Sequence, residues 1–103
     1  MQIIKQDQFN DVINNGITLV DFYADWCGPC KMLGPVLEEV SKSYLNINFV
    51  KVNCDENMEL CEQYQIMSIP AVFLFKDGKL IGKTGGYQSD SAIKQFIDSS
   101  LNR

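Results

Sequence analysis

The chain has 103 residues, 46% of them apolar, which predicts one domain over residues 1–103 with a core that needs no structural disulfides. A formal charge of −4, with no basic patch, argues against nucleic acid as the main partner. The absence of histidine excludes Ser-His-Asp and Cys-His catalytic pairs and histidine-ligated metals.

The first half of the chain alternates between strand and helix patterns. Strands are favoured by dense apolar runs of strand length, and helices by apolar residues at helical spacing. The elements expected are, in order, a strand at 3–4, a helix capped by Asp7, a strand at 18–24, a helix over 31–44, a strand at 47–53 and a weaker helix over 57–64.

The second half predicts a hairpin and a last helix. Two strands, at 71–75 and 79–84, flank Asp77-Gly78, a pair suited to the positive φ angles of a type I′ turn. Ser89 or Asp90 can cap the final helix. This order predicts an α/β fold: a mixed five-stranded sheet of three parallel strands plus an antiparallel hairpin, flanked by four helices.

The N-terminus shows no basic region followed by an apolar stretch and a cleavage site, and no apolar run is long enough to span a bilayer. We therefore expect a cytoplasmic protein that does not enter a membrane. In that compartment paired cysteines are more often catalytic, redox-sensing or metal-binding than structural.

Cys27-Gly28-Pro29-Cys30 directly follows the strongest strand pattern, at the start of a helix. It fits a redox dithiol, half of a zinc site completed by Cys54 and Cys61, or two incidental thiols. Six residues separate Cys54 from Cys61, which is wide for zinc ligands, and Pro29 suits the first turn of a helix. The pattern therefore favours the redox dithiol.

Helix position distinguishes the two thiols. Cys27 faces free backbone N–H groups and the positive end of the helix dipole, and Lys31 adds a nearby charge. Cys27 is therefore the expected nucleophile on a substrate disulfide. Cys30 lies one turn further in, is expected to be more buried, and would resolve the mixed disulfide.

Residues 20–31 (VDFYADWCGPCK) resemble the active-site segment of the thioredoxin family. Ile69-Pro70, the run at 75–78 and Gly86 match the family in order and spacing, so the resemblance covers essentially the whole chain. It implies the thioredoxin fold and reduction of protein disulfides. Gly28-Pro29 resembles the reducing members, since oxidising and isomerising relatives usually carry a histidine there.

Two charged residues inside strand patterns acquire roles from the resemblance. Asp21 would be a buried carboxyl that accepts the proton of Cys30, and Lys51 would be its lysine partner. From the pattern alone, Asp21 could instead be a solvent-facing strand residue and Lys51 an exposed lysine.

The resemblance also implies a substrate surface. Ile69-Pro70 would be a cis peptide beside the dithiol, where an extended substrate pairs with the backbone and Gly86 leaves room. Trp26 would flank Cys27 with Gly28-Pro29, its indole held by Asp55. The alternatives are a strand boundary at Ile69-Pro70, a plain loop at Gly85-Gly86 and a core position for Trp26.

The implied partners are disulfide-containing proteins and a separate flavin-dependent thioredoxin reductase that passes electrons from NADPH. No glycine-rich nucleotide fingerprint occurs, so no cofactor or metal is expected on this chain, which should be a monomer. A docking or stability subunit of a larger assembly is the alternative function.

Cys54 and Cys61 are expected to be inert, although Cys54 could lie at the rim of the substrate groove and be oxidised.

Overall fold

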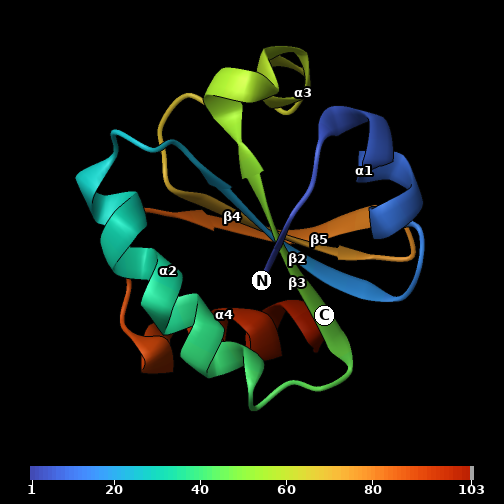
Figure 1. Ribbon diagram of the computed structural model, residues 1–103. Helices are drawn as coiled ribbons and strands as arrows, with labels where there is room; N and C mark the ends of the chain where they lie inside the picture. The colour runs from blue at the N-terminus through green and yellow to red at the C-terminus, as the bar shows by residue number, and fades with distance from the viewer. Residues whose placement is uncertain (103) are drawn as a thin grey trace.

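The computed structural model describes residues 1–102 (Figure 1). The elements are β1 (Gln2–Ile3), α1 (Gln6–Ile13), β2 (Ile17–Tyr23), α2 (Gly28–Ser41), β3 (Ile47–Asn53), a 3₁₀ turn (Cys54–Glu56), α3 (Met58–Gln63), β4 (Ala71–Lys76), β5 (Lys79–Gly85) and α4 (Asp90–Leu101). This order confirms the expected α/β fold, and every expected element is found.

The five strands form one mixed sheet in the order β1-β3-β2-β4-β5. The first three strands in this order are parallel, and β4 and β5 form the antiparallel hairpin. One edge therefore gathers the ends of β2 and β3, the start of β4 and the end of β5. Register pairs Tyr23 with Asn53, Phe22 with Ala71, and Ala71 with Gly85 along that edge.

Helices cover both faces of the sheet, with α1 and α3 on one side and α2 and α4 on the other (Figure 1). Successive residues of β2 point to opposite faces, so Phe22 enters one core and Leu19 the other. Burial on both faces explains why β2 reads as a continuous apolar run. It also explains why Asp21, in the middle of that run, must be buried.

The starts of helices α1 and α2 are explained by the residues that form their N-caps. Helix α2 begins at the cysteine pair, as expected from Pro29 in its first turn and three residues before the apolar spacing at 31–44, with Cys27 as its N-cap. Asp7 does not cap α1, so that expectation was wrong: Lys5 is the N-cap, and its N–H donates to the Gln8 side chain at 2.9 Å.

The β4–β5 turn has the conformation expected from Asp77-Gly78. Both residues have positive φ, 49° and 86°, as a type I′ turn requires. Among residues 1–102, no helix combines the length and the apolar character needed to cross a membrane.

Candidate active site

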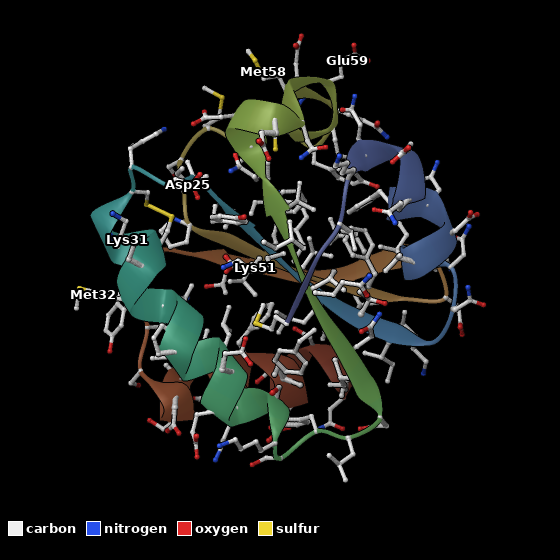
Figure 2. All side chains as sticks on the ribbon, in the orientation of Figure 1. Asp25, Lys31, Met32, Lys51, Met58 and Glu59 are labelled. Atoms are coloured by element: carbon white, nitrogen blue, oxygen red, sulfur yellow. A yellow bond between two sulfur atoms is a disulfide. The ribbon has the colours of Figure 1, made fainter. Side chains whose placement is uncertain are left out.

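The two cysteines at the start of α2 form a disulfide, with their Cα atoms 5.2 Å apart; it is the yellow bond beside Lys31 in Figure 2. Cys27 is the N-cap, and its Sγ accepts a hydrogen bond from the Cys30 N–H at 3.2 Å. The first turn of α2 holds no acidic side chain. Backbone donor and helix dipole therefore both favour negative charge on Cys27.

Cys30 is not the more buried thiol, contrary to expectation, since Cys27 is 4% exposed and Cys30 5%. The reason lies in the loop before β4, which covers Cys27. The carbonyl oxygen of Ile69 lies 3.8 Å from the Cys27 sulfur, and the Ile69 side chain packs against the cysteine cluster. A property that depends on this distant loop cannot be read from helix position.

The loop before β4 has the geometry that the resemblance implied. The Ile69-Pro70 peptide bond is cis. The Gly86 N–H donates to the Pro70 carbonyl at 2.9 Å, so the end of β5 is tied to the same loop. Gly86 has φ +79°, and no neighbour lies within 4 Å of the place a Cβ would take. The backbone at Gly86 is therefore accessible to an approaching chain.

Trp26 lies on the surface beside the disulfide and is 71% exposed, so the alternative of a core position was wrong. Its Nε1 donates to the Asp55 carboxylate at 2.8 Å, the expected contact. The side chain of Asn53 accepts from the Asp55 N–H at 2.9 Å and thereby orients that carboxylate. Sequence reasoning missed Asn53, although an asparagine side chain often accepts from the backbone N–H two residues further on.

Asp21 is 1% exposed, and within residues 1–102 neither carboxylate oxygen has a hydrogen-bond partner, so the solvent-facing alternative was wrong. Burial raises the pKa of Asp21 from 3.8 to about 6, while the positive charge of Lys51 opposes that rise. The two residues are register partners on adjacent parallel strands. A carboxyl group with this pKa exchanges protons near neutral pH.

Lys51 is half-buried, and aromatic packing helps to position it. Its Nζ lies 4.2 Å from the centroid of the Tyr23 ring, a cation–π contact that sequence reasoning did not foresee. A surface hollow lined by Tyr23, Lys31 and Lys51 reaches Cys30.

The other two cysteines lie apart from this chemistry. Cys27 and Cys30 are joined in a disulfide, and across the described part of the chain no three Cys, Asp or Glu side chains gather as metal ligands, so the four-cysteine zinc alternative has no support in this geometry. Cys54 is half-buried and Cys61 is buried, and burial raises the pKa of both thiols. Both therefore stay protonated at neutral pH, which makes them poor nucleophiles.

Comparisons with known proteins agree with this geometry. The family model described as Thioredoxin matches residues 1–99. A thioredoxin of Chlamydia trachomatis serovar D is 44% identical over 95 residues, covering 91% of this chain and 93% of the relative. A thioredoxin of Staphylococcus saprophyticus is 41% identical, covering 98% of this chain and 100% of the relative. The Plasmodium falciparum thioredoxin structure has a TM-score of 0.89 and 39% identity, covering 96% of this chain and 98% of that one.

Proposed function

The chain belongs to the thioredoxin family, and we propose how its residues divide the work of reducing a protein disulfide. Members of the family are thiol–disulfide oxidoreductases, and Cys27 and Cys30 are the redox pair here. The observation that carries the proposal is the N-cap geometry, in which the Cys30 N–H donates to the Cys27 sulfur.

The reaction starts from the reduced dithiol. The Cys27 thiolate attacks one sulfur of the client disulfide, the client S–S bond breaks, and one client thiolate leaves and takes a proton. The Cys30 thiol then loses its proton and attacks the Cys27 sulfur. The mixed disulfide breaks, the second client thiol is released, and the Cys27–Cys30 disulfide forms.

Asp21 is the proton acceptor for Cys30. With a pKa of about 6, its carboxylate is mostly ionised at neutral pH, yet it is basic enough to take a proton from a thiol through water. Lys51 keeps the carboxylate ionised by opposing the rise in its pKa. The hollow lined by Cys30 and Lys51 is the route by which we propose that this water enters.

The client binds over the disulfide, beside the exposed side chain of Trp26. Trp26 and Gly28-Pro29 flank Cys27 on the helix side, while on the sheet side lie the Ile69 backbone, beside the Cys27 sulfur, and the open space at Gly86. An extended client segment can pair with the Ile69 backbone as an added strand. This places the client sulfur beside the Cys27 sulfur.

The oxidised chain has to be re-reduced after each turnover. Family membership implies a reductase and disulfide-containing clients as partners. The reductase we propose is a flavin-dependent thioredoxin reductase that draws on NADPH. The proposed setting is the cytoplasm, where the reduced dithiol is the stable form, and the proposed working unit is a monomer.

An insulin reduction assay tests the proposal, with dithiothreitol or reductase and NADPH as the electron source. The wild-type chain should accelerate precipitation of reduced insulin, and the double variant Cys27→Ser, Cys30→Ser should not. Cys61→Ala, which removes a buried thiol away from the pair, should keep the rate. Insulin reduction by the double variant would contradict the proposal, and retained cellular function without reduction would favour a docking role.

A further inference from the structure

A surface groove lies over the 3₁₀ turn and α3. Two of its lining side chains, Met58 and Met67, are 71% and 93% exposed. Figure 2 shows Met58 pointing outward beside Glu59 at the outer end of α3. Covering an exposed methionine side chain is favourable because it removes apolar surface from water, and the flexible thioether adapts to varied partners.

The same groove has a one-sided charge. Asp55 and Glu62 line it, and the stretch 54–67 also contains Glu56 and Glu59 but no lysine or arginine. The ion pairs found within residues 1–102 use none of these four carboxylates. We call the surface formed by Asp55, Met58, Glu62 and Met67 the acidic methionine groove. Its potential favours a cationic partner over an anionic one.

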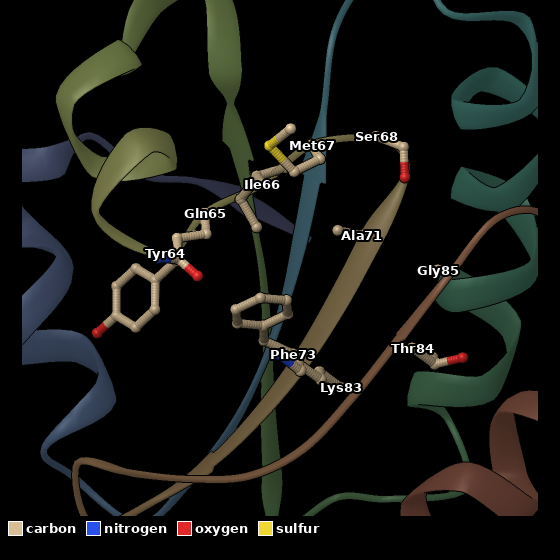
Figure 3. A pocket seen from close by; sticks show the side chains of 10 residues that line it. All are labelled: Tyr64, Gln65, Ile66, Met67, Ser68, Ala71, Phe73, Lys83, Thr84 and Gly85. Carbon is tan, nitrogen blue, oxygen red and sulfur yellow. The ribbon is translucent and has the colours of Figure 1, made fainter.

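The acidic methionine groove is continuous with the redox site at two points. Asp55 holds the indole of Trp26, the residue before Cys27. Met67 lies two residues before Ile69, whose carbonyl is 3.8 Å from the Cys27 sulfur. Figure 3 shows Met67 and Ser68 on the loop that leads to β4. An extended chain advances about 3.3 Å per residue, so client residues a few positions from the attacked cysteine reach the groove.

We propose that the acidic methionine groove binds the client segment flanking the attacked cysteine and selects segments with a bulky apolar side chain beside lysine or arginine. The methionines cover the apolar side chain, and Asp55 and Glu62 attract the cation. This inference rests on the proposed disulfide-reductase function, because it concerns which clients that site reduces first.

The test compares two disulfide peptides that differ only in the residues flanking one cysteine, Lys-Leu in one and Glu-Ser in the other. The ratio of their kcat/KM values is measured for each variant. Wild type should prefer the Lys-Leu peptide by about three- to tenfold at low salt, with a smaller preference at high salt. Glu62→Lys should weaken this preference, because the new cation offsets the charge of Asp55, and Met67→Ser should weaken it by removing an apolar contact.

Matched controls lie at the other end of the sheet. Leu45→Ala removes a side chain as exposed as Met67, and Asp11→Lys makes the same charge change as Glu62→Lys on α1; both should keep the wild-type ratio.

A wild-type ratio near one, or an unchanged ratio in Glu62→Lys and Met67→Ser, would overturn the inference. The inference would also be overturned if Glu62→Lys and Met67→Ser changed only the rate at which the reductase re-reduces the chain and left the peptide ratio unchanged. Failure of wild type to reduce even a small aromatic disulfide would instead refute the reductase function.

Discussion

At the scale of single residues, Asp21 is the group on which the proton chemistry depends. Its carboxylate is buried in the middle of β2 with no hydrogen-bond partner among the residues described, and only the charge of Lys51 offsets the cost of that burial. Such a group is unfavourable for stability when ionised. That cost makes its role testable by stability as well as by rate.

Asp21→Asn should change how stability depends on pH. The folded chain holds the Asp21 proton up to a pKa of about 6, against 3.8 when unfolded. The favourable contribution of the protonated form is therefore complete below about pH 4 and is lost as pH rises through 6. Relative to the variant, wild type should lose about 3 kcal/mol of unfolding free energy between about pH 3 and pH 7. Urea unfolding of the oxidised proteins measures this, and parallel pH curves would argue against it.

The same variant should slow the second chemical step. Without a carboxylate to accept the proton of Cys30, attack on the mixed disulfide should be slower by about tenfold or more near neutral pH. The difference should shrink at high pH, where the Cys30 thiol ionises without help. Rapid-quench analysis of mixed-disulfide decay gives the rate, and decay as fast as in wild type would remove Asp21 from the mechanism.

The identity and spacing of single residues in the sequence predicted part of this site. Asp21 is visible because an acid inside an apolar strand run is unusual, and Cys27 and Cys30 because of their spacing at a strand–helix junction. The cation–π contact of Lys51 with Tyr23 was not visible, because it needs two strands to pair in a specific register. Long-range pairing also decided how deeply Cys27 is buried.

At the scale of elements, the short helix α3 depends on side-chain hydrogen bonds more than on its own length. Its N-cap, Asn57, is buried; its Nδ2 donates to the Asn53 carbonyl, and its Oδ1 accepts from the Gln6 N–H, both at 2.8 Å. One side chain therefore joins α3 to the end of β3 and to the start of α1. A six-residue helix would not persist alone in water.

Asn57→Ala should consequently destabilise the fold by about 2–3 kcal/mol, since it leaves the buried carbonyl of Asn53 and the part-buried N–H of Gln6 without their partner. The loss should appear in the free energy of unfolding from urea titration. Asn46→Ala, at an exposed position, is the matched control and should change it by less than about 0.5 kcal/mol. Equal effects of the two substitutions would refute the structural role of Asn57.

Whether a segment forms a helix or a strand was predicted correctly wherever its local sequence pattern was strong. Strand β3 appears at its expected bounds, and the Asp77-Gly78 turn adopts the expected conformation. Helix α3 gave a weak signal because Asn57 holds it through partners up to 51 residues away. The apolar spacing of α2 begins only after its first turn, so the start of this helix is indicated by Pro29 and the cysteine pair instead.

At the scale of the whole molecule, sheet topology assembles the site. Parallel β2 and β3 end at the edge where antiparallel β4 begins and β5 ends. That edge brings the start of α2, the Ile69-Pro70 loop and Gly86 around one disulfide. The order of elements predicted this mixed sheet, whereas the distances around the disulfide required the folded chain.

Trapping the mixed disulfide tests the central claim, that Cys27 attacks the client and Cys30 resolves the complex. The Cys30→Ser variant is mixed with a disulfide peptide, and intact and digested protein are analysed by mass spectrometry. We predict a stable one-to-one adduct on Cys27 in this variant and no adduct on Cys30 in the Cys27→Ser variant. An equally abundant adduct on Cys30 in Cys27→Ser, or none on Cys27 in Cys30→Ser, would contradict the assignment.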